Sequence, residues 1–364
     1  MMPLVVLATV DPVLRDAAVF SLLTDLPGTG FVRQDMDPGS GTVRRVAGDA
    51  DGLVDDVTEP FAHGCPGCVQ RENLLPAMEA MAGRGRWSRM VLALPVAGAS
   101  APAARPLADP ALRRRLGVEL ATVVCVVDVD RVEHDLMGGQ LLTDRGLGLA
   151  AGDGRAVGEV LAAQLAHADV VLTTGSDPAG RTLVDHLRGR RSSRRDLFDA
   201  DARELFTARH SAGQAAARID PYWISRSSTP DAHGVWSLDL ISERPVHPER
   251  FLDRLPDLAG GRVRTRGRFR VPTRPDRLGV LDGTGGHLSI GDAGRPATPL
   301  ATRMVITGVG TGTGDRHRAF ADILLTDREM GSDRDWSTVD DGLDDWLGAV
   351  ADVVGARHAV SFTC

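Results

Sequence analysis

Short apolar runs alternate with amphipathic stretches through the first half of the chain. Continuously apolar runs lie at residues 4–9, 89–94, 121–127 and 170–173. Between them, apolar side chains recur at helical spacing, for example at residues 13–23, 69–81 and 157–167. A run that is apolar at every position is typical of a strand buried on both faces. The pattern therefore predicts an α/β domain whose parallel sheet is covered by helices on both sides.

The second half of the chain has a different pattern. Residues 235–243 alternate between apolar and polar side chains, which indicates a half-exposed strand, and residues 262–271 and 304–309 are further strand candidates. Helical spacing occurs at residues 248–255 and 315–325. This mixture predicts a smaller α+β domain with an antiparallel sheet.

Composition shifts mark the expected domain borders. A chain of 364 residues is long enough for two cores. Residues 189–201 are rich in Arg, Ser and Asp, as is typical of a connection between domains. We expect a first domain at residues 1–200, a second at 201–330 and an acidic extension at 331–364. A last amphipathic helix is expected near residues 343–354 of that extension.

Charge and composition exclude some classes of partner. The net charge is −7, so binding to polyanions through overall charge is not expected, and we expect no DNA partner. All 42 basic residues are arginine, so no lysine can neutralise a phosphate. The amino terminus lacks the features of a signal peptide, and no run is apolar over the length of a membrane span. A cytoplasmic protein with no membrane partner is the expectation.

Two of the four cysteines lie in one stretch, which reads His63-Gly64-Cys65-Pro66-Gly67-Cys68. The Pro-Gly pair bends the backbone so that both sulfurs can face one point, as a tetrahedral zinc ion or a reversible disulfide requires. No second ligand pair follows at the spacing of a zinc finger, so the stretch is at most half of a structural site. Zinc binding, a redox role and a simple turn all remain open. A reducing cytoplasm favours a metal site over a permanent disulfide.

The order of the elements resembles that of the CobW family of P-loop GTPases and metallochaperones. The family motif Gly-Cys-x-Cys-Cys before a helix is similar to residues 64–68. Residues 164–172 resemble the helix and strand before the family's base-recognition loop. Residues 243–251 and 261–269 resemble the start of the CobW C-terminal domain, and residues 303–308 a later strand of it. The resemblance implies a parallel-sheet, P-loop-GTPase-like domain followed by a smaller α+β domain.

The family's phosphate loop, Gly-x-x-Gly-x-Gly-Lys-Thr, is altered in this chain. Aligned without a gap, its replacements are Thr9, Pro12 and Leu14 for the glycines, Arg15 for the lysine and Asp16 for the threonine. Pro12 has no N–H to donate, Leu14 crowds backbone that must touch phosphate, and Asp16 brings a carboxylate to the polyphosphate. Asp11 and Pro12 fit instead the N-cap and first position of a helix.

Two further nucleotide-binding elements of the family are also altered. The loop after residue 94 reads Pro-Val-Ala-Gly and keeps only the glycine of an acidic residue followed by Thr-Gly. The base-recognition motif Asn-Lys-x-Asp becomes Thr174-Gly175-Ser176-Asp177, in which Asp177 alone retains the ability to accept hydrogen bonds from a base. The resemblance therefore implies a GTPase-like scaffold without GTP hydrolysis. GTP and Mg²⁺ are not expected as cofactors, and we assign no catalytic residues.

Two arginine-rich stretches are candidates for contacts with RNA. Arginine recurs at every second position of one expected strand, which would place on one face Arg262, Arg264, Arg266, Arg268 and Arg270. A second cluster lies at residues 188–195 and is a candidate for a disordered loop. Such a row can clamp phosphates, or it can form a solvated face paired with acids, which the acidic net charge favours.

Three functions follow from these features. The first is a CobW-like protein of zinc homeostasis that binds zinc through His63, Cys65 and Cys68 and does not hydrolyse GTP; two thiolates and an imidazole suit Zn²⁺ better than harder cations. The second is a non-catalytic, zinc-responsive protein that docks on a protein client, a ribosome or a ribosome-associated factor. The third is a metallochaperone that retains GTP binding, with Asp177 contacting the base.

Overall fold

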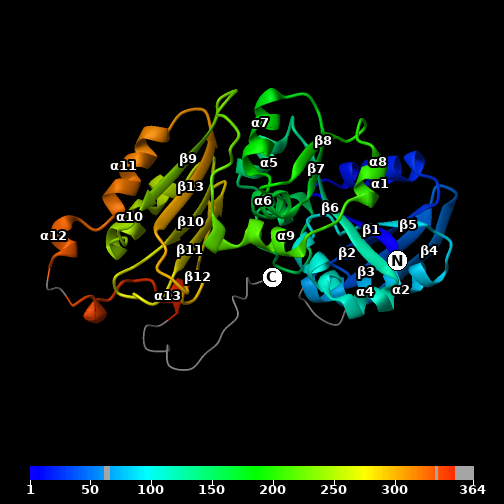
Figure 1. Ribbon diagram of the computed structural model, residues 1–364, viewed down its shortest axis with the longest axis horizontal. Helices are drawn as coiled ribbons and strands as arrows, with labels where there is room; N and C mark the ends of the chain where they lie inside the picture. Colours follow the sequence, from blue (N-terminus) through cyan, green and yellow to red (C-terminus); the bar gives the residue numbers. More distant parts are fainter. Residues whose placement is uncertain (61–65, 333–334, 349–364) are drawn as a thin grey trace. The chain divides into compact units, whose positions relative to one another are not determined.

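The chain forms two compact units (Figure 1). The computed structural model describes residues 1–60, 66–332 and 335–348, and for residues 66–74 and 337 it describes the backbone alone. Among the described residues, the first unit comprises Met1–Asp135 and Gln140–Ile219, and the second comprises Leu136–Gly139 and the residues from Asp220 to Gly348. No helix among the described residues combines the length and the apolar character that crossing a bilayer requires.

The first unit is built on an eight-stranded sheet. Its strands are β1 (Met2–Ala8), β2 (Thr29–Asp37), β3 (Thr42–Asp49), β4 (Gly52–Pro60), β5 (Arg89–Ala93), β6 (Val118–Asp128), β7 (Val170–Thr174) and β8 (Ser193–Asp196). Their order is β4-β3-β2-β5-β1-β6-β7-β8. The pairs from β2 to β8 are parallel, and β3 pairs antiparallel with β2 and β4. The mostly parallel sheet confirms the predicted fold class.

Helices cover both faces of this sheet. They are α1 (Pro12–Asp25), α2 (Pro66–Gly83), α3 (Ser100–Ala104), α4 (Pro110–Leu116), α5 (Val132–Met137), α6 (Val157–His167), α7 (Pro178–Leu187), α8 (Ala202–Thr207) and α9 (Ala212–Ile219). Side chains of β1 alternate between the two resulting cores: Leu4 and Val6 pack with Met78 of α2, whereas Val5 and Leu7 pack on the opposite face, with α1 and α8. This is the two-sided burial predicted from the apolar run.

The boundary between the units lies later than the expected border at residue 200. The Arg-rich stretch after α7 is not a loop between domains, because it forms the edge strand β8, parallel to β7. The chain then continues within the first unit, where Leu205 and Phe206 of α8 join the core. Arg218 of α9 donates hydrogen bonds to the backbone oxygens of Ala166 and His167, at the carboxyl end of α6.

The second unit contains a five-stranded antiparallel sheet of order β12-β11-β10-β13-β9. Its strands are β9 (Val235–Ser242), β10 (Val263–Phe269), β11 (Gly279–Thr284), β12 (His287–Asp292) and β13 (Thr302–Val309). Its helices are α10 (Pro248–Ala259), α11 (Thr313–Ile323), α12 (Asp327–Met330) and α13 (Asp344–Leu347). Helices α10 and α11 lie side by side along one face of the sheet (Figure 1), where Phe251 and Phe269 stack with ring centroids 4.3 Å apart. The expected α+β domain is confirmed.

The start of the acidic extension is fastened to the second unit by Arg274. Its guanidinium donates to both oxygens of Asp341, at 2.8 and 2.9 Å, and to Asp344 at 2.6 Å. The side chains of Arg274 and Asp341 are only 4% and 1% exposed, and Leu343 and Leu347 enter the apolar core. The predicted helix near residues 343–354 is shorter than expected, since α13 ends at Leu347, and the residues after 348 lie outside the described part of the chain.

Replacing Arg274 by methionine should destabilise the second unit by about 3 kcal/mol, because the variant leaves the buried Asp341 carboxylate without its cation. Urea unfolding followed by tryptophan fluorescence measures this, since four of the five tryptophans lie in the second unit. The matched control is Arg295→Met, which removes an ion pair between two exposed side chains and should leave the midpoint unchanged. Equal midpoints for all three proteins would show that the Arg274 pair does not hold the extension.

A buried polar cluster in the first unit makes its stability depend on pH. The imidazole of His167 lies 2.9 Å from the hydroxyl of Ser100, and both side chains are buried. Burial, together with the nearby His210 and Arg218, lowers the pKa of His167 to about 4 from an ordinary value of 6.5. The unfolded chain therefore takes up this proton between pH 6.5 and pH 4 while the folded chain does not.

Stability from His167 is present above pH 6.5 and is lost as the pH falls towards 4, so the wild type should lose about 2 kcal/mol through this residue between pH 7 and pH 5. His167→Asn keeps a hydrogen-bonding group near Ser100 but does not titrate, and should lose correspondingly less. Urea midpoints by circular dichroism at the two pH values measure the difference. An identical pH dependence in wild type and variant would contradict the assignment; exposed His134→Asn is the control.

Candidate functional site

The loop after β1 occupies the position at which folds of this kind bind phosphate. β1 lies between β5 and β6, and the chain leaves β1 towards β2 on one side but leaves β5 towards β6 on the other. In open α/β sheets, ligands bind at the carboxyl ends of the strands where the connections diverge in this way. The candidate nucleotide site is therefore formed by residues 9–11, the first turns of α1 and the loops after β5 and β7.

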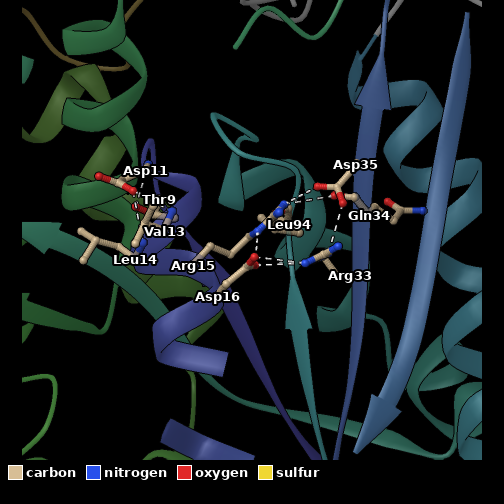
Figure 2. Close-up of polar contacts among 10 residues, drawn as sticks. All are labelled: Thr9, Asp11, Val13, Leu14, Arg15, Asp16, Arg33, Gln34, Asp35 and Leu94. Carbon is tan, nitrogen blue, oxygen red and sulfur yellow. Dashed lines mark hydrogen bonds and ion pairs between the residues drawn. The ribbon is translucent and has the colours of Figure 1, made fainter. Parts of the chain in front are cut away.

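The amino terminus of α1 is capped by the chain itself. The carboxylate of Asp11 accepts the backbone N–H groups of Val13 at 2.8 Å and Leu14 at 3.1 Å (Figure 2). Pro12 is the first helical residue and has no N–H. The hydroxyl of Thr9 donates to the backbone oxygen of Val126 at 2.8 Å. The donors that hold a phosphate at a helix amino terminus are thus absent or already used, as expected from the sequence.

Arg15, which takes the position of the family's lysine, is buried and points towards β2 (Figure 2). Its Nη1 lies 2.6 Å from the carboxylate of Asp35 and 3.5 Å from the backbone oxygens of Gln34 and Leu94. Its Nε lies 3.3 Å from the carboxylate of Asp16. The guanidinium is therefore held among groups of the protein.

A second arginine closes this arrangement into a ring of four charges. Arg33 of β2 contacts Asp16 at 3.1 Å and Asp35 at 3.1 Å. Asp16 and Asp35 each contact both arginines, so two positive and two negative side chains balance one another. We define these four residues, Arg15, Asp16, Arg33 and Asp35, as the charge ring. The β2 half of the charge ring is not evident from the sequence, because residues 29–37 contain no apolar run that marks a strand.

Hydrogen bonds join the loop after β5 to the loop after β1. The N–H of Ala97 donates to the backbone oxygen of Thr9 at 2.9 Å, and Ala97 has a left-handed φ of 64° that is strained for a non-glycine residue. The buried amide of Gln164 donates to the backbone oxygens of Gly98 at 2.8 Å and Thr9 at 3.4 Å. Two loops that would contact the phosphates of a nucleotide are thus hydrogen-bonded to each other.

The predicted base-binding residue Asp177 caps a helix. Its two carboxylate oxygens accept the N–H groups of Ala179 at 3.1 Å and Gly180 at 2.9 Å, in the first turn of α7. Asp130 accepts the N–H groups of Ser176 and Asp177, and these two bonds lower the pKa of Asp130. The structure places Asp177 at the expected loop after β7 and gives its carboxylate a structural task there. Base binding by Asp177 stays a prediction.

The predicted zinc ligands lie at the edge of what the structure describes. His63 and Cys65 fall outside the described residues, and Cys68 belongs to the first turn of α2, where only the backbone is described. Among the described residues, no group of three His, Cys, Asp or Glu side chains is placed to hold a metal ion. Cys125 is fully buried in β6, and burial raises the pKa of its thiol. It is the core residue expected from its apolar surroundings.

The arginine row on β10 is not a solvated face. Arg264 and Arg268 are buried, contrary to expectation. Arg264 pairs with Asp282, and Arg268 donates to the backbone oxygens of Tyr222 at 2.6 Å and Ala301 at 3.1 Å. In the second cluster, Arg188 and Arg194 both pair with Asp185, at 2.8 and 3.0 Å. These arginines stabilise the fold through internal contacts, as the ion-paired alternative anticipated, although without the expected exposure.

Fold and site together define the class of protein: a GTPase-like α/β domain followed by an α+β domain, in which Asp11 and Asp177 cap helices and Arg15 pairs with Asp35. This chain belongs to the CobW family. The model of the CobW/HypB/UreG nucleotide-binding domain matches residues 46–197, and that of the cobalamin synthesis protein CobW C-terminal domain matches residues 235–324. The first match begins beyond β1 and α1, so it does not include the altered phosphate loop.

The sequence is similar to proteins from two mycobacteria. The zinc chaperone Rv0106 of Mycobacterium tuberculosis is 27% identical over 332 residues, covering 79% of each chain. The uncharacterized protein Mb0109 of Mycobacterium bovis has the same identity and coverage. Among solved structures, the Zn(II)-bound YjiA GTPase from E. coli is 13% identical with a TM-score of 0.37, covering 89% of this chain and 99% of that one.

Proposed function

We propose that this chain carries zinc ions as cargo, binding them through His63, Cys65 and Cys68, and that it does so without hydrolysing GTP. The absence of GTP hydrolysis is supported by the contacts of the residues at the candidate nucleotide site. Asp11 and Asp177 cap helices, and Arg15 is paired with Asp35. Zinc binding is supported by the thiol and imidazole groups of the motif and by the relative named as a zinc chaperone.

The motif residues suit a transferable zinc ion. Thiolate and imidazole ligands select Zn²⁺ over Mg²⁺ and Ca²⁺, which take oxygen ligands. Three protein ligands leave one tetrahedral position for water or for a ligand from a recipient protein, as in open zinc sites. The thiols must lose their protons to bind the ion, so zinc affinity should fall as the pH is lowered.

The docking alternative receives no support from the arginine row. Two of its five arginines, Arg264 and Arg268, are buried and bonded within the second unit. A surface that clamps RNA needs arginines whose donors are available to phosphate oxygens. We therefore do not extend the proposal to a ribosome, although a protein client that receives the zinc remains part of it.

The cysteine motif predicts where zinc is held. The wild type should withdraw zinc from a chromophoric chelator in a competition titration, and Cys65→Ser/Cys68→Ser should not, because serine hydroxyls are poor zinc ligands. His63→Ala should weaken binding by about tenfold or more, as expected for loss of one ligand. The matched control is Cys125→Ala, which removes a buried thiol and should compete as the wild type does. Equal competition by wild type and double variant would refute the zinc site.

The filled nucleotide site predicts no binding of GTP. Isothermal titration of the wild type with GTP and Mg²⁺ should give no saturable heat at millimolar nucleotide, because α1 offers neither free N–H groups nor a lysine. Arg15→Lys alone should not create binding, since Pro12 and Leu14 remain. Saturable binding that Asp177→Ala abolishes would instead establish the retained-GTP alternative.

A further inference from the structure

The charge ring occupies the place where a phosphate-binding domain meets its ligand. Arg15 is one turn into the helix that follows β1, the position from which a basic side chain reaches a bound phosphate. Here its nearest anion is the carboxylate of Asp35, at 2.6 Å. Asp35 belongs to β2, the strand that α1 leads into. An ion pair therefore joins Arg15 of α1 directly to β2.

We propose that Asp35 is an internal anion that stands in for a bound phosphate and holds β2 against α1. In proteins with nucleotide switches, a phosphate orders the segment after the first helix, and its loss releases that segment. In this chain the carboxylate of Asp35 supplies the negative charge, so the ordered state is built into the fold. The proposed role of Asp35 goes beyond the proposed function, because it concerns the candidate nucleotide site and does not depend on zinc binding by the cysteines.

The contacts of Asp35 make it a bridge. Its Oδ1 lies 2.6 Å from Nη1 of Arg15 on α1, and its Oδ2 lies 3.1 Å from Nε of Arg33 on its own strand. Arg15 is further held at 3.5 Å by the backbone oxygens of Gln34 and Leu94 (Figure 2), so the same guanidinium also reaches the end of β5. Removing the carboxylate breaks the shortest contact of Arg15 and leaves it the carboxylate of Asp16, at 3.3 Å.

Burial decides what that removal should do. The Arg15 side chain is 5% exposed, whereas that of Asp35 is 35% exposed. Without Asp35 the charge ring has two guanidinium groups and one carboxylate, so a buried positive charge is left without balance and gains from any anion that reaches it. Because the side chain of Asp35 is partly open to solvent, one phosphate group of an added pyrophosphate can reach the space that the missing carboxylate leaves. Chemical rescue by an added anion is therefore the distinguishing consequence.

The experiment compares the thermal midpoints of wild type, Asp35→Ala and Asp55→Ala, with and without inorganic pyrophosphate. Asp55 is the matched control, since it pairs with Arg45 at 3.1 Å in the β3–β4 hairpin of the same sheet. Asp35→Ala should unfold at a lower temperature than the wild type, and pyrophosphate should raise its midpoint by about 3 °C. The wild type and Asp55→Ala should shift by less than about 1 °C, because their Arg15 is already paired.

Two further variants keep the test decisive. Asp35→Glu retains a carboxylate and should behave as the wild type, without a response to pyrophosphate. Should Asp35→Ala fail to fold, Asp35→Asn removes the charge at nearly constant volume and takes its place. A folded neutral variant that pyrophosphate does not stabilise, or equal shifts in all proteins, would overturn the proposal and leave Asp35 an ordinary structural ion pair. GTP binding by the wild type would count against the part of the proposed function that concerns GTP, but the rescue result would still decide the role of Asp35.

Discussion

A buried guanidinium must be paired, and in this protein that requirement organises the carboxyl edge of the first sheet. Arg15 cannot reach solvent from its place on α1, so Asp35 and Asp16 hold it and Arg33 balances them. At the same edge, Asp11 caps α1 and Asp177 caps α7. Gln164 donates hydrogen bonds to the loops after β1 and β5. Each of these groups makes its contacts within the chain.

Much of the fold was predictable from the sequence, because apolar runs and helical spacing report burial directly. The helix that begins at Pro12 is further marked by Asp11, which caps it. The sequence does not reveal the hairpin of β3 and β4 for a physical reason. β4 is an exposed edge strand, and arginines interrupt the buried residues of β3, such as Arg44, which pairs with Asp56, so neither strand has an apolar run. The domain border was placed too early because charged residues of β8 resemble a linker.

Some features of the candidate site could likewise be predicted from the sequence, and others could not. Loss of a phosphate donor at Pro12 and crowding at Leu14 could be predicted, since they depend only on which residues follow the strand. The partner of Arg15 could not, because Asp35 is distant in sequence and meets it only through sheet pairing of β2 with β5. Periodicity likewise placed the arginines of β10 on one face correctly but did not predict their burial, which depends on what packs over the sheet.

A crystal structure determined from crystals grown with saturating GTP and Mg²⁺ would show whether side chains of the protein fill the place of a nucleotide. We expect an Arg15–Asp35 ion pair, Asp11 on the first turn of α1 and no nucleotide beside them. A triphosphate bound at the start of α1, with Arg15 turned onto it and released from Asp35, would show that the site still takes its nucleotide.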